Sequence, residues 1–106
     1  MSIKAKNILK EIHCGLNLLY KRRLKGVYLF GSYARGEEGP ESDLDVLIVL
    51  DKIGHYSGEV DRTGEIISGL SLKYGIAISR VFVAEKDWRN TDTNFLANVR
   101  EEAQTA

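Results

Sequence analysis

Residues 27–50 read VYLFGSYARGEEGPESDLDVLIVL, and this stretch decides the fold of the chain. The apolar run that ends at Phe30 predicts a strand, and Gly31 and Ser32 follow it as a sharp turn into a short helix. Backbone amides at the start of such a helix, together with the Ser32 hydroxyl, form an anion site of the kind that phosphates occupy. The polar residues 37–41, which include the only proline, predict a loop that leads into a second strand at residues 43–50.

Two carboxylates stand at the start of this second strand. Asp43 and Asp45 are two residues apart, so the period of a strand places both on one face. Their Cα atoms are expected about 6–7 Å apart, close enough for both side chains to bind one Mg²⁺ or to share two. A D-x-D pair alone is often an acidic strand start exposed to water. Beside Gly31 and Ser32, a metal site is the favoured interpretation.

The stretch from Gly31 to Val46 resembles the signature of the nucleotidyltransferase superfamily of DNA polymerase beta, which is G-[GS], about ten residues and D-x-D. The fuller string, G-S-x-A-R-G followed by S-D-x-D and a hydrophobic strand, is similar to the minimal nucleotidyltransferases. These are small single domains that often act with a helical HEPN-domain partner. The motif covers only about a sixth of the chain, but several separate features must coincide to produce it.

The hydrophobic pattern of the rest of the chain predicts one small sheet with helices mainly on one face, an α/β (α+β) fold. The resemblance implies the same mixed sheet of the nucleotidyltransferase fold, in one domain over residues 1–106. The basic cluster at residues 21–23 is interpreted as a solvated face or a complement to a helix dipole. The expected helices are 2–24, 59–73, 85–89 and 94–103, and the expected strands are 26–30, 43–50 and 76–83.

Composition narrows the classes of function. At 106 residues the chain is too short for a catalytic domain and a separate substrate domain. Its 15 basic and 15 acidic residues cancel, so there is no overall field to hold a polyanion, and a nucleic-acid partner is not expected. The single Cys14 cannot form an intramolecular disulfide, and no stretch has the character of a signal peptide or membrane span. A cytoplasmic location without membrane association is therefore expected.

The resemblance implies that Asp43 and Asp45 are the catalytic residues and hold Mg²⁺ or Mn²⁺, which bridges the phosphates of ATP or another nucleoside triphosphate. Gly31 and Ser32 are expected to hold the β- and γ-phosphates, although a tight turn and a helix cap would use the same residues.

Arg35 and Ser42 complete the expected nucleotide-binding set. Arg35 is expected to contact a phosphate. The alternatives are pairing to Asp43 or to a nearby glutamate, and a solvated surface arginine. Ser42 is expected to orient Asp43 or to close the loop.

The third expected strand departs from the family pattern. Many members of the superfamily carry a third acidic residue there, and Ser79 is expected at about that position. A serine hydroxyl supplies neither a negative charge nor a strong base. Glu65, Glu85 or Asp87 could substitute from another direction, or a partner or substrate could complete the site.

The leading hypothesis is an enzyme that transfers a nucleoside monophosphate, with ATP as the expected donor, to a hydroxyl. By analogy with antitoxins that share the motif, the acceptor would be a tyrosine or other hydroxyl on a HEPN-type toxin. Transfer to a small molecule such as an aminoglycoside is disfavoured, because those enzymes usually add a helical domain. The rival from another class is a non-catalytic, antitoxin-like binding module with a degenerate nucleotidyltransferase fold, which Ser79 favours and the intact Asp43 and Asp45 oppose.

Overall fold

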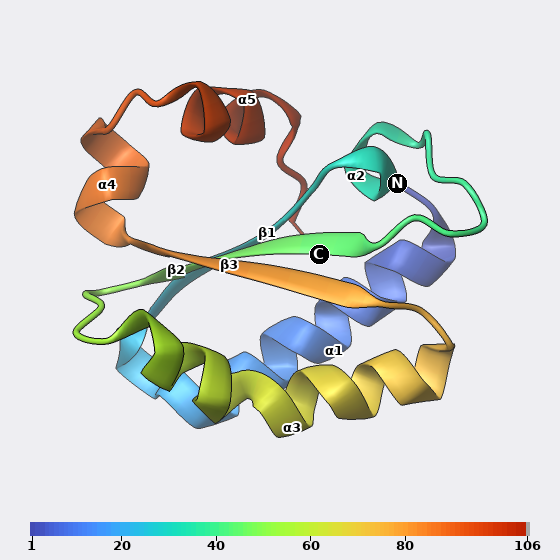
Figure 1. Ribbon diagram of the computed structural model, residues 1–106, viewed down its shortest axis with the longest axis horizontal. Helices are drawn as coiled ribbons and strands as arrows, with labels where there is room; N and C mark the ends of the chain where they lie inside the picture. Colours follow the sequence, from blue (N-terminus) through green and yellow to red (C-terminus); the bar gives the residue numbers. More distant parts are fainter. Residues whose placement is uncertain (106) are drawn as a thin grey trace.

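A three-stranded sheet in the order β1-β2-β3 forms the centre of the molecule in this computed structural model, which describes residues 1–105 (Figure 1). The central strand β2 pairs antiparallel with β1 and parallel with β3, so the expected mixed sheet is confirmed. The elements are α1 (Ile3–Tyr20), the 3₁₀ turn η1 (Lys21–Arg23), β1 (Leu24–Phe30), α2 (Ser32–Arg35), β2 (Leu44–Leu50), α3 (Tyr56–Tyr74), β3 (Ile78–Ala84), α4 (Glu85–Asn90) and α5 (Asn94–Glu102).

The two long helices, α1 and α3, lie on one face of the sheet, as the sequence predicts (Figure 1). Ile8, Ile12 and Leu16 recur at helical spacing and are fully buried against this face. The first turn of α1 is capped by the Ser2 hydroxyl, which accepts a hydrogen bond from the Ala5 amide at 3.1 Å. Within residues 1–105, no helix is long and apolar enough to cross a membrane.

The short helices α4 and α5 lie over the opposite face of the sheet, a placement that the sequence does not specify (Figure 1). Val99 of α5 packs there against Leu47 and Val49 of the central strand. The ring of Trp88 in α4 lies 4.9 Å from that of Tyr28 in β1. The central strand is therefore covered on both sides, which explains its nearly continuous hydrophobic sequence.

The junction between α3 and β3 differs from the prediction. The strand begins at Ile78 rather than at residue 76. Gly75 ends α3 in a left-handed conformation, with φ +65°. The Ile76 amide then donates to the Ser71 carbonyl, and its carbonyl accepts from the Ser71 hydroxyl. Because the helix end uses the polar backbone groups of residue 76, the ladder to β2 starts two residues later.

Within the basic cluster at residues 21–23, Lys21 and Arg22 are exposed, as predicted for a solvated face, but Arg23 is not. The helix α1 ends at Tyr20, and Arg23 donates to Glu59 at 2.8 Å and to Asp51 at 3.2 Å. Glu59 is only 4% exposed and also accepts from the Tyr20 hydroxyl at 2.9 Å. Burial alone would raise the pKa of Glu59, but the bonds from Arg23 and Tyr20 outweigh it and lower this pKa. The network ties α1 and η1 to α3.

Candidate active site

The turn between β1 and α2 has a backbone that only glycine adopts readily. Gly31 has φ +78° and ψ −158°, and its carbonyl accepts from the amides of Ala34 and Arg35 at 3.1 and 3.2 Å. Ala34 is buried and Tyr33 is half-buried against the core, so this side of α2 is anchored. Because the amides of Ala34 and Arg35 are bound to Gly31, the amides of Ser32 and Tyr33 are the ones that the turn can offer to a phosphate.

Gly31 also makes room for a carboxylate. A Cβ atom added to Gly31 would lie 2.4 Å from Oδ2 of Asp45 and 3.3 Å from its Cγ. Phe30, the residue before Gly31, is in register with Asp45 across the β1–β2 pair. The turn and the aspartate therefore form one structural unit, and the absence of a side chain at position 31 is a requirement of the site.

Asp45 is half-buried beside other negative charges. Burial raises its pKa first, followed by the negative charges of Asp43 and Glu102, while Arg35 acts in the opposite direction. Burial and negative charge therefore outweigh the one positive charge that acts on this carboxylate, that of Arg35. Such a carboxylate pair suits a divalent cation, and oxygen ligands of this kind are those that Mg²⁺ and Mn²⁺ prefer.

Asp43 is exposed and immediately precedes β2, which starts at Leu44 rather than at residue 43. Ser42 closes the preceding loop, because its hydroxyl accepts from the Gly39 amide at 2.9 Å and its amide donates to the Gly39 carbonyl at 3.2 Å. A pocket of about 240 Å³ opens beside Asp43 and Ser42 and is also lined by Lys4. Lys4 comes from the start of α1, and no sequence motif indicated that it lies here.

Arg35 contacts glutamates, which was the alternative to a phosphate contact in the sequence interpretation. It donates to Glu102 of α5 at 2.6 Å and to Glu37 at 3.3 Å. These bonds raise the pKa of Arg35, the Glu102 bond most strongly. Glu102 is 67 residues from Arg35 in the chain, and nothing in the sequence predicts that α5 folds back to bring the two together.

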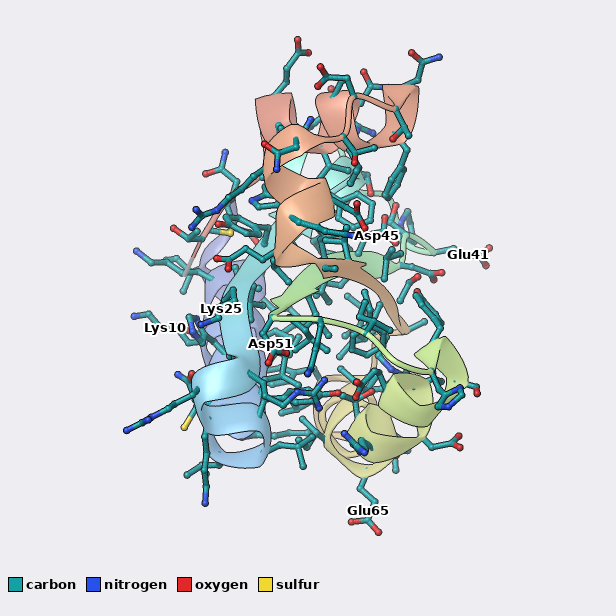
Figure 2. All side chains as sticks on the ribbon, turned by 90° about the vertical axis from the view of Figure 1, so that its left-hand side faces the viewer. Lys10, Lys25, Glu41, Asp45, Asp51 and Glu65 are labelled. Carbon is teal, nitrogen blue, oxygen red and sulfur yellow. The ribbon has the colours of Figure 1, made fainter. Side chains whose placement is uncertain are left out.

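Ser79 lies beside Asp45 in the sheet. In the parallel β2–β3 pair, Asp45 is in register with Ser79, so the two side chains share a face of the sheet. Glu85 and Asp87 cannot replace the missing carboxylate, since they follow the far end of β3, roughly 20 Å along the strand from Ser79. Glu65 is also excluded, because it lies on α3 below the opposite face of the sheet from Asp45 (Figure 2).

The chain therefore provides two carboxylates and a glycine turn at one end of the sheet. Among residues 1–105, no group of three or more histidine, cysteine or acidic side chains is arranged to hold a metal ion. A divalent cation at Asp43 and Asp45 would take its remaining ligands from phosphate oxygens and water, as Mg²⁺ commonly does.

Comparisons with known proteins agree with this arrangement. Residues 6–101 match the family described as nucleotidyltransferase domain. Two proteins of Methanocaldococcus jannaschii, each named "putative protein adenylyltransferase", are similar to the chain. One is 36% identical over 97 residues, covering 91% of each chain, and the other is 42% identical over 74 residues, covering 70% of this chain and 74% of its own.

Solved structures share the fold. A crystal structure of a toxin–antitoxin with AMP-PNP has a TM-score of 0.63 at 20% identity and covers 91% of this chain and 69% of that one. A mutant of the toxin–antitoxin MntA-HpeT has a TM-score of 0.62 at 17% identity, covering 94% of this chain and 69% of that one. A structure described as a "putative minimal nucleotidyltransferase" has a TM-score of 0.58 at 22% identity, covering 96% and 95%. With its glycine turn, its paired aspartates and a family match over most of its length, this chain belongs to the nucleotidyltransferase domain family.

Proposed function

We propose that this chain is a protein adenylyltransferase, which transfers AMP from ATP to a hydroxyl group of a partner protein. The observation that carries the proposal is the Gly31–Asp45 contact, which sets a carboxylate directly against the turn assigned to phosphate. The names of the two Methanocaldococcus jannaschii relatives support a protein acceptor. The toxin–antitoxin structures support a toxin as that partner, and the AMP-PNP in one of them supports ATP as the donor. The HEPN type of the toxin is proposed from the resemblance of the motif alone.

Each residue of the site has a role in this reaction. Asp43 and Asp45 would hold Mg²⁺ or Mn²⁺, and the cation would neutralise the negative charge that develops on the phosphates. The amides after Gly31 and the Ser32 hydroxyl would bind the β- and γ-phosphates and orient the α-phosphorus toward the acceptor. Ser42 keeps the loop closed, so that Asp43 stays beside Asp45.

Binding of metal and nucleotide provides the first test. ATP with Mn²⁺ at a hundredfold excess over Kd should stabilise the fold by about 2.7 kcal/mol, a rise in Tm of roughly 10–20 °C for a domain of this size. The double variant Asp43→Asn with Asp45→Asn should lose the metal-dependent part. The matched control Asp61→Asn with Glu65→Gln removes two exposed carboxylates from α3 and should respond like the wild type.

Transfer provides the second test. ATP labelled at the α-phosphate should label a HEPN-domain protein encoded beside this chain, whereas ATP labelled at the γ-phosphate should not. The Asp43→Asn and Asp45→Asn variant should lose about 10²-fold or more in rate, because metal stabilisation of a transition state is worth several kcal/mol. Label from the γ-phosphate without label from the α-phosphate would indicate phosphoryl transfer with release of ADP, and would contradict the proposal.

The second candidate is a non-catalytic, antitoxin-like module that neutralises its partner by docking. The observation in its favour is Ser79, which stands in register with Asp45 where a third carboxylate is usual. This function predicts that the partner binds, receives no label and is neutralised equally well by the Asp43→Asn and Asp45→Asn variant. Loss of neutralisation in that variant, with binding retained, would exclude it.

A further inference from the structure

The C-terminal helix brings an acidic side chain to the edge of the active site. Glu102 is the last residue of α5, and its Oε2 accepts from an Arg35 guanidinium nitrogen at 2.6 Å. Its side chain is 21% exposed, less than that of Glu37, the other partner of Arg35, at 66%. The less exposed and shorter bond is the stronger of the two.

The backbone around Glu102 is held on both sides. Phe95, one end of α5, packs edge-to-face on Phe30 with ring centroids 5.6 Å apart, and Phe30 is in register with Asp45. After the helix, Gln104 and Leu29 exchange two backbone hydrogen bonds of 2.8 and 2.9 Å. The place of Glu102 beside the site is therefore determined by the backbone as well as by its ion pair.

Arg35 is bound to carboxylates in the way that it would bind a phosphate. A guanidinium group forms the same forked hydrogen bonds with both kinds of oxygen. Arg35 ends the four-residue helix that begins at Ser32, so a triphosphate on the Gly31–Ser32 turn would lie about one helical turn away. A pocket of about 450 Å³ opens between Arg35 and the α5 residues Asn98, Glu101 and Glu102, which gives space for such an exchange.

We propose that Glu102 is the third acidic residue of this site. Glu102 binds Arg35 until a nucleotide phosphate takes its place on the guanidinium group. The negative charge of the released Glu102 then adds to those of Asp43 and Asp45. Glu102 acts through Arg35 and through the local field, so it is a positioning residue. Its position on α5 compensates for the hydroxyl at Ser79. The inference rests on the proposed function, because it requires a triphosphate at the Gly31 turn.

The variant Glu102→Gln tests the exchange, because it should change two affinities in opposite directions. ATP in EDTA should bind about two- to fivefold more tightly, since the exposed ion pair that competes for Arg35 is removed. Mn²⁺ without nucleotide should bind more weakly by a similar factor, since one negative charge near Asp45 is lost. Glu65→Gln is the matched control, because it removes the same charge from an exposed side chain of α3, on the opposite face of the sheet, and should change neither affinity.

Arg35→Gln identifies the route of the effect. In this background, Glu102→Gln should tighten ATP binding less than it does in the wild type, because only the field effect remains, but it should still weaken Mn²⁺ binding. Affinities would be measured by competition with a fluorescent ATP analogue to millimolar Kd and by Mn²⁺ titration, with Tm as a control for folding.

The outcomes separate the two proposals. The exchange is overturned if Glu102→Gln behaves like Glu65→Gln, if it weakens both ligands together, or if it binds no ATP in EDTA. The proposed function still stands in these cases if the wild type binds Mn²⁺ with ATP. A wild type that binds neither ligand overturns both.

Discussion

Replacement of Gly31 by alanine tests the contact on which the site is built. Two costs add. A residue with a side chain at φ +78° and ψ −158° costs about 1–3 kcal/mol, and forcing an atom to within 2.4 Å of Asp45 Oδ2 costs about 1–3 kcal/mol more unless Asp45 moves. The sum is roughly 2–6 kcal/mol, a large part of the 5–15 kcal/mol typical of a whole domain. A Tm lower by roughly 8–48 °C is expected, at about 4–8 °C for each kcal/mol.

Gly36→Ala is the matched control. Gly36 also has positive φ, +72°, but no atom lies within 4 Å of the added Cβ. It carries only the conformational cost, about 1–2 kcal/mol. Equilibrium unfolding in urea at constant m-value measures both variants.

A double-mutant cycle isolates the contact between Gly31 and Asp45. Asp45→Ala removes the carboxylate, so Gly31→Ala should cost about 1–3 kcal/mol less in that background than in the wild type. If Asp45 simply turns away from the new methyl group, the coupling will be near zero and only the conformational cost will remain. If Gly31→Ala lowers the free energy of unfolding no more than Gly36→Ala does, the reasoning is refuted.

Three further predictions follow from the charges. Glu59→Ala should destabilise by about 3 kcal/mol at pH 7, because it leaves Tyr20 and Arg23 without their buried partner. Since the pKa of Glu59 is lowered in the fold, this stabilisation is present above about pH 4 and is lost as the pH falls through the folded pKa, so the difference in urea unfolding should shrink in acid. Asp45→Asn should have the opposite effect. The pKa of Asp45 is raised in the fold, so its ionised form opposes folding at neutral pH. Without metal, the variant should be about 1 kcal/mol more stable than the wild type at pH 7 and equally stable below about pH 4. Ser79→Asp adds a carboxylate in register with Asp45 and should tighten Mn²⁺ binding by about tenfold or more in a titration; unchanged affinity would show that Ser79 does not face the metal.

The sequence by itself determined the parts of the site that lie close together in the chain. The glycine turn and the two aspartates fall within 16 residues, from Gly31 to Val46, and strand period and turn chemistry act over that range. The same local rules predicted the strands and long helices, with errors mainly at their ends. One such error, at residue 76, arose because the capping bonds to Ser71 took precedence over strand pairing.

Only the tertiary structure decided which distant residues join the site. The register of β2 and β3 placed Ser79 beside Asp45, and it placed Glu85 and Asp87 too far away to supply a third carboxylate there. The packing of α5 on the second face of the sheet brought Glu102 to Arg35 across 67 residues. These contacts depend on strand order and on which face each helix covers. Hydrophobic patterns show that a face is buried but not what it is buried against, so contacts of this kind do not follow from local sequence.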